Sequence, residues 1–280
     1  MNTAPTPPER QTVLIRLQNA AFHKAKFWTV ALVNLQAFLF AGGLVSIFSG
    51  CWSLSYPWLA FPLAAAGAVM AARATHLKGR AELIKRQHEF IDGLGTAPSS
   101  RALANLQAEL PPDLKPEVDR LLTQGVTFAS TESVGLARAL DNLRESAFFS
   151  HHLARLCAGY LLALMIVTGV IAVSFLLFCL HTLQDASAGV TAARAIAATL
   201  VFLISVGTLK SWHGYARFSA NADQAHAEAA RLLKETALEP CDAHRAIAEY
   251  QLARAGAPMI PTLVWKLNRE RLTKIWAGTR

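Results

Sequence analysis

The feature that most constrains this chain is residues 157–180, CAGYLLALMIVTGVIAVSFLLFCL, which contain no charged side chain. An α-helix rises about 1.5 Å per residue, so roughly 20 apolar residues cross the hydrocarbon core of a bilayer. Residues 27–48, FWTVALVNLQAFLFAGGLVSIF, form a second uncharged run of comparable length. Both runs are therefore predicted to be transmembrane helices.

Two shorter apolar runs follow, at residues 58–72 and 195–209. Each is separated from the long run before it by a connector without Lys or Arg, residues 49–57 and 181–189. Tryptophan and tyrosine in and beside the first connector are typical of a membrane surface. We therefore predict an all-α integral membrane protein with four transmembrane helices, arranged as two helical hairpins with cytoplasmic helical extensions.

Basic residues flank the four runs on the sides away from the two connectors. They are Arg10, Arg16, Lys24 and Lys26 before the first run, Arg73, Lys78, Arg80, Lys85 and Arg86 after the second, Arg144 and Arg155 before the third, and Lys210 and Arg217 after the fourth. Lys and Arg near span ends stay in the cytoplasm, so both termini and the central segment are predicted to be cytoplasmic. Arg194 is the exception, and it lies close enough to the surface to snorkel.

This orientation divides the chain into alternating cytoplasmic and membrane segments. They are a cytoplasmic N-terminal helix (1–26), transmembrane hairpin 1 (27–72), a cytoplasmic helical segment (73–156), transmembrane hairpin 2 (157–209) and a cytoplasmic C-terminal helical segment (210–280). Polar helices at residues 73–94 and 211–233 look like direct continuations of the second and fourth runs, which indicates an architectural duplication. Breaks are predicted at residues 93–100 and 111–116. Short amphipathic helices are predicted at residues 101–110 and 116–124.

The C-terminal segment predicts a last helix with Pro261 at or near its first turn. Its apolar side includes Trp265 and Trp276, and its cations are Lys266, Arg269, Arg271 and Lys274. This composition suits a helix lying on an anionic leaflet, where these residues contact lipid or regulate the protein. It suits equally an amphipathic helix docked on its own protein.

The net charge of +8 could indicate a nucleic-acid partner. No basic run alternates with aromatic residues, however, and no RNA-binding or zinc-finger pattern occurs, so we expect no direct nucleic-acid binding. Flanks of membrane helices explain the charge. The cysteines (Cys51, Cys157, Cys179 and Cys241) are scattered, which makes a disulfide framework or a zinc site improbable.

Motifs for catalysis are missing from the sequence: it has no G-x-S-x-G, H-E-x-x-H, P-loop or G-x-G-x-x-G. His151 and His152 are adjacent, and adjacent helical residues point to different sides, so they make a weak joint metal site. We therefore expect a non-enzymatic protein with no catalytic residues, no metal and no cofactor.

Polar residues within the apolar runs are the candidate pore or interhelical residues. They are Asn34 and Gln36 in the first run, Thr168 and Ser174 in the third, and Thr199, Ser205 and Thr208 in the fourth. Such groups need partners in lipid, so they either bond between helices or line a polar path in an assembly of several copies. The runs contain no charged residue, which argues against a proton-coupled transporter.

The layout resembles the SMODS-associated four-transmembrane effectors of bacterial anti-phage systems, which are related to the two-span SLATT group. Local matches are IRLQNAAFHKAK, AELIKRQHEFID, NLRESAFFSHHL and YQLARAGAPMIPTLVWKL. The resemblance implies a pore-forming effector of the bacterial inner membrane that acts in abortive infection. Its implied partners are membrane lipids, further copies of itself in a homo-oligomer, and an upstream sensor protein or nucleotide second messenger.

A second class of function stays open. The chain could be a membrane-anchored sensor or scaffold that recruits a cytosolic partner through residues 95–145 or 240–280. Toxicity on overexpression separates the two classes, because a scaffold should leave the membrane potential unchanged.

Overall fold

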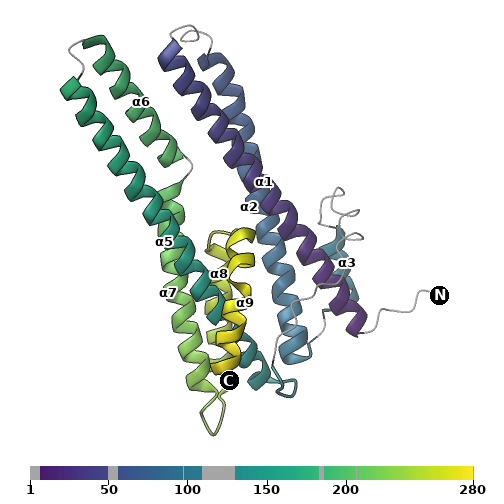
Figure 1. Ribbon diagram of the computed structural model, residues 1–280. Coiled ribbons are helices and arrows are strands. Elements are labelled where there is room, and N and C mark those ends of the chain that lie inside the picture. Colours follow the sequence, from purple (N-terminus) through teal and green to yellow (C-terminus); the bar gives the residue numbers. More distant parts are fainter. Residues whose placement is uncertain are drawn as a thin grey trace. The chain divides into compact units, whose positions relative to one another are not determined.

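The computed structural model describes residues 7–49, 56–96, 98–108, 130–182, 186–205 and 207–279 (Figure 1). These residues contain helices and turns and no strand, which confirms the predicted all-α class. The helices are α1 (Pro7–Ser49), α2 (Tyr56–Leu94), α3 (Ser100–Ala108), α5 (Leu136–Thr182), α6 (Ala186–Ser205), α7 (Thr208–Leu232), α8 (Pro240–Gly256) and α9 (Thr262–Thr279). Most of the first connector, the centre of the second, and the break and helix expected over residues 111–124 lie outside the described residues.

The chain divides into two compact units. Unit 1 comprises residues 1–26, 75–156 and 214–280, and unit 2 comprises residues 27–74 and 157–213. Helices α1, α2, α5 and α7 each contribute to both units without interruption. Each unit is therefore built from helical segments that are distant in the sequence.

Unit 1 has a hydrophobic core. Its largest fully buried side chains are Leu14, Ile84, Leu140, Leu232 and Leu272, one each from α1, α2, α5, α7 and α9. Large aliphatic side chains that gather inside a helical bundle are typical of a water-exposed domain. Helix α8 contributes the buried apolar residues Ala243, Ala246, Ile247 and Tyr250.

Unit 2 shows the opposite distribution. Its buried apolar residues are all small: Ala74, Cys157, Ala158, Ala192 and Ala195. Large apolar side chains cover its outside instead, including Trp58, Phe61, Ile171 and Phe178 at 84%, 80%, 62% and 61% exposure. Among the described residues, the exposed large hydrophobic side chains outside unit 2 are Leu83, Val134, Leu252, Leu263, Leu267 and Ile275.

Two helices contain stretches long and apolar enough to cross a membrane, residues Gln11–Ile47 of α1 and Leu136–Phe175 of α5. In their most apolar windows only 6% and 11% of the residues are buried, so these stretches are not core helices of a water-soluble bundle. The apolar part of α6, Gly189–Leu200, is shorter, and α2 is not among the candidates. Two of the four predicted spans are thus long and apolar enough to cross a membrane, which is compatible with the predicted membrane protein.

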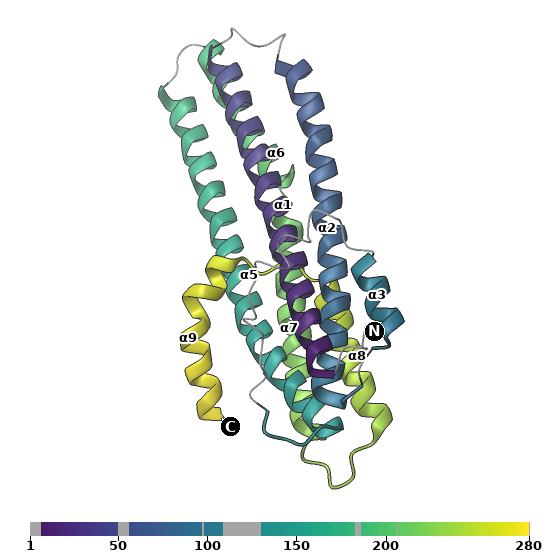
Figure 2. The ribbon, with the colours of Figure 1, turned by 90° about the vertical axis from the view of Figure 1, so that its right-hand side faces the viewer.

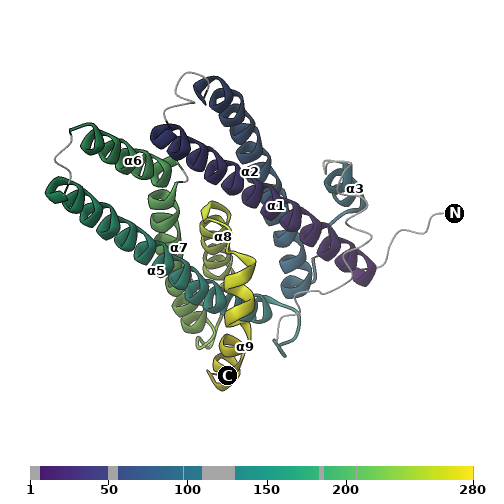
Figure 3. The same ribbon diagram turned by 45° about the horizontal axis from the view of Figure 1, so that its top comes forward.

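Helices α1 and α2 run side by side within unit 2 (Figure 3). Gly67 of α2 faces Leu32 and Leu35 of α1 there, and a Cβ atom at Gly67 would make ordinary contacts with their side chains at 3.4 and 3.7 Å. The Arg73 guanidinium lies 5.2 Å from the ring centre of Trp28, on the same pair of helices. Helix α2 continues from its apolar part into its polar part, as predicted.

The predicted continuity after the fourth run is wrong. Helix α6 ends at Ser205, and α7 begins at Thr208, after Gly207 with a φ of 70°. Glycine adopts this left-handed conformation without the steric cost that a Cβ atom brings, so the chain turns there and starts a new helix. Ser205 and Thr208 therefore lie on different helices.

Candidate functional site at helix α8

A row of charged residues runs along one face of α2 in unit 1. Lys78, Glu82, Lys85 and Glu89 follow one another at spacings that place them on the same side of a helix. This face meets α8, whose residues are mostly small or polar. The contact between the two helices is therefore ionic.

Arg254 of α8 lies at the centre of this contact. Its Nε donates to Glu82 Oε2 at 2.8 Å, its Nη1 to Glu89 Oε1 at 2.6 Å and its Nη2 to Glu89 Oε2 at 3.0 Å. The side chains of Arg254, Glu82 and Glu89 are 6%, 8% and 14% exposed. The guanidinium also lies 5.5 Å from the ring centre of Tyr250. One planar cation thus bridges two carboxylates that lie two turns apart on α2, a geometry that lysine cannot reproduce.

Further polar contacts secure the end of α8. Gln251 Nε2 donates to Glu89 Oε2 at 3.3 Å, and Arg86 Nη2 donates to the Gln251 carbonyl at 3.1 Å. Lys78 Nζ donates to the Ala255 carbonyl at 2.9 Å and also to that of Ala257. A lysine at this position satisfies carbonyls that the end of a helix leaves without partners.

The charges in this interface depend on one another. Burial alone would raise the pKa of Glu89, but the charges of Arg254 and Lys85 outweigh it and hold the pKa below its ordinary value. Burial lowers the pKa of Lys85, and the nearby charge of Arg254 lowers it further. Removing one member of such a buried set leaves the remaining charges without compensation, which is strongly destabilising.

Other faces of α8 contact α5 and α7. The Tyr250 hydroxyl forms hydrogen bonds with Ser146 and Ser150 of α5, at 2.9 and 2.8 Å. Its ring lies 6.4 Å from that of Phe218 on α7, centre to centre. Helix α8 therefore links three helices of unit 1.

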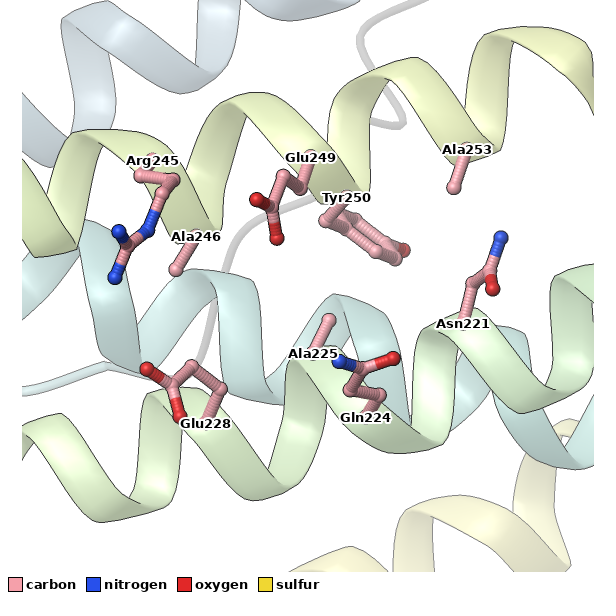
Figure 4. Close-up of a pocket in the computed structure, with 9 residues that line it drawn as sticks. All are labelled: Asn221, Gln224, Ala225, Glu228, Arg245, Ala246, Glu249, Tyr250 and Ala253. Carbon is pink, nitrogen blue, oxygen red and sulfur yellow. The ribbon is translucent and has the colours of Figure 1, made fainter.

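A polar groove of about 410 Å³ lies between α7 and α8 (Figure 4). Its lining residues are Asn221, Gln224, Ala225, Glu228, Arg245, Ala246, Glu249, Tyr250 and Ala253. The small side chains of Ala225, Ala246 and Ala253 do not fill the groove. Glu228 bonds Arg231, and Arg245 bonds Asp242, each on its own helix. The polar groups of Asn221, Gln224 and Glu249 make no hydrogen bond with another described residue, so they are available to a partner.

Helix α9 is docked on α5 (Figure 2). Trp276 packs against Phe148 with ring centres 5.2 Å apart, and the Arg144 guanidinium lies 5.2 Å from the Trp276 ring. Trp265 lies 5.9 Å from Phe149. Both tryptophans of the candidate membrane-surface set therefore face the protein. The other members, Lys266, Arg269, Arg271 and Arg194, are exposed.

The rings of the adjacent histidines lie 4.9 Å apart, centre to centre, and each ring also has a neighbour of its own. His151 Nδ1 is 3.0 Å from the Ser219 carbonyl, and the His152 ring lies 4.4 Å from that of Phe148. In the part of the chain that the structure describes, no group of three or more His, Cys, Asp or Glu residues could hold a metal ion.

The candidate polar residues of the apolar runs do not gather at one place. Asn34 and Ser174 are exposed, whereas Gln36 and Thr168 are half-buried. Thr199 donates to the Ala195 carbonyl of its own helix at 2.9 Å, and Thr208 is buried at the start of α7. The Ser205 side chain lies outside the described residues.

The Arg254 contact was missed by reasoning from the sequence. The spacing of Lys78, Glu82, Lys85 and Glu89 was the available signal, because alternating charges on one helix face suit an ionic partner helix. Comparisons with protein-family models, with curated proteins and with solved structures gave no match. A function for this chain is therefore inferred from its own residues.

Proposed function

We propose that this chain is a non-enzymatic membrane effector, which oligomerises and permeabilises the bacterial inner membrane when unit 1 releases its control. The observation behind this proposal is that apolar side chains are distributed in opposite ways in the two units. Unit 1 buries its large aliphatic residues, whereas unit 2 exposes residues such as Phe38 and Ile171 and buries alanine. A surface of this kind is unfavourable in water and favourable in lipid.

Four spans follow from this proposal, two in each hairpin, with both termini and unit 1 in the cytoplasm. The flanking Lys and Arg residues support that orientation. Four helices of this kind cannot enclose a wide channel alone, so several copies must assemble. Membrane lipids and further copies of the chain are then its first partners.

The ionic contact of α8 supports a regulatory role for unit 1. Helix α2 runs without a break from the Arg254 contact in unit 1 into the apolar part of unit 2. A signal that separates α8 from α2 would change the forces on a helix that also enters the membrane. Switches commonly work through such local changes of charge and packing. An upstream sensor protein or a nucleotide second messenger would supply the signal in an anti-phage, abortive-infection system.

Dye release from liposomes tests the effector function. The purified full-length chain is reconstituted as wild type, as Arg254→Met, which breaks the α8 contact, and as Arg231→Met, which changes an exposed ion pair. We expect faster release with Arg254→Met than with the other two. Liposomes that stay sealed with all three proteins, including in the presence of candidate activators, would contradict the proposal.

A scaffold that recruits a cytosolic partner is the second candidate function. The groove between α7 and α8 favours it, because Asn221, Gln224 and Glu249 present polar groups without partners among the described residues. Expression in cells separates the two functions. An effector with the Arg254→Met change should collapse the membrane potential, whereas a scaffold should leave it intact.

A further inference from the structure

The outer face of α1 in unit 2 carries one amide among apolar side chains. Asn34 is exposed and makes no hydrogen bond with another described residue. Val30, Phe38 and Val45 on the same face are 58%, 64% and 60% exposed. Leu35, by contrast, lies on the side of α1 that faces Gly67 of α2.

Exposure of this amide has a different meaning in lipid than in water. An amide without a partner in hydrocarbon loses its hydrogen bonds to water and gains nothing in return. Thr199 avoids this problem by bonding the Ala195 carbonyl of its own helix. Asn34 has no such arrangement within the described part of the chain, which leaves its amide available to a partner from another chain.

We infer that the Asn34 face of α1 is the contact between two copies of this chain in the membrane. The two amides are complementary, because each Asn34 offers an NH₂ group with two N–H donors and a carbonyl oxygen as acceptor, and the facing Asn34 offers the same groups. Ala37 and Ala41 are exposed on the same face, and small residues let two helices approach closely in lipid. A two-fold contact of this kind is the commonest unit of homo-oligomers. The inference rests on the proposed insertion of unit 2 in a membrane.

Asn34→Leu tests the contact, because leucine is similar in size and cannot form the hydrogen bonds. Energy transfer between donor- and acceptor-labelled full-length chains in liposomes measures the association. Interhelical amide bonds in lipid are worth about 1–2 kcal/mol in model peptides, so we expect association to weaken about 5- to 30-fold. Val170→Leu is the matched control, because it places leucine at an exposed apolar position of α5.

Cross-linking gives an independent readout of the same face. The native cysteines are replaced by alanine, and one new cysteine is introduced by Ala37→Cys on the proposed contact or by Leu35→Cys on the side facing α2. We expect oxidation in liposomes to give a disulfide dimer with Ala37→Cys and not with Leu35→Cys. The opposite pattern, or unchanged association of Asn34→Leu, overturns the inference.

The outcomes also separate this inference from the proposed function. A wild-type chain that stays monomeric in liposomes overturns the inference and, with it, the oligomeric effector of the proposed function. A chain that alkaline carbonate strips from membranes overturns the proposed function and this inference together. A chain that remains integral and releases dye, but associates equally well as wild type and Asn34→Leu, overturns the inference alone.

Discussion

Replacing Arg254 with methionine should detach α8 from α2. The change leaves the carboxylates of Glu82 and Glu89 without their shared cation, at 8% and 14% exposure. Removing one partner of a buried ion pair costs about 3–5 kcal/mol. We take the lower end, about 3 kcal/mol, because a buried carboxylate can take up a proton and so limit the cost. A penalty of this size is a large fraction of the stability of an ordinary domain.

Hydrogen–deuterium exchange of the full-length chain in detergent or nanodiscs measures this penalty locally. A cost of about 3 kcal/mol corresponds to a roughly 100-fold increase in the opening of α8, visible as faster exchange of its amides. Arg254→Lys should give an intermediate effect, because it keeps the charge and loses the bidentate geometry. Arg231, 53% exposed, is the matched control, and Arg231→Met should leave exchange in α8 unchanged. Equal exchange in the Arg254→Met and Arg231→Met chains would refute the reasoning.

Two further predictions concern the stability of unit 1. Gly93→Ala should lower the free energy of unfolding by about 1–3 kcal/mol, because the new Cβ would lie 2.8 Å from a Cβ of α5. Gly79→Ala lies in open space on the same helix and should raise the free energy of unfolding by about 0.5–1 kcal/mol. Thermal unfolding checks both, and equal shifts would contradict the packing argument. Burial lowers the pKa of His88 below 6.5, and Arg254 and Lys85 outweigh burial to lower that of Glu89 below 4.5. As the pH falls, His88 and Glu89 therefore take up protons in the unfolded chain at a higher pH than in the folded chain. The free energy of unfolding should fall as the pH drops below about 6.5 and fall further below about 4.5. Thermal unfolding midpoints that do not change between pH 7 and pH 4 would contradict this prediction.

The helical class and the two longest apolar helices could be predicted from the sequence because their signals are local. Residues 157–180 contain no charge, and a helix is the one simple way for such a run to satisfy its backbone in lipid. The start of α9 was also predicted, since Pro261 suits the entry to a helix, and α9 begins at Thr262. These features depend on neighbouring residues alone.

The ionic contact of α8 could not be predicted, because it joins residues that are far apart in the sequence. Arg254 and Glu82 are 172 positions apart, and no local pattern sets the register between two such helices. The break before α7 was missed for a different reason. Residues 195–209 read as one apolar run, and the single glycine at position 207 gave no sign of its left-handed conformation.

The interruption at Gly207 lies within unit 2, between α6 and α7. Helices α1, α2, α5 and α7 pass from one unit to the other without interruption, whereas α6 joins α7 at this turn. A rod transmits twist about its own axis, and a joint of this kind absorbs it. Twist carried along α7 would thus be absorbed at Gly207 before it reached α6, whereas α1, α2 and α5 contain no such turn where they pass between the units.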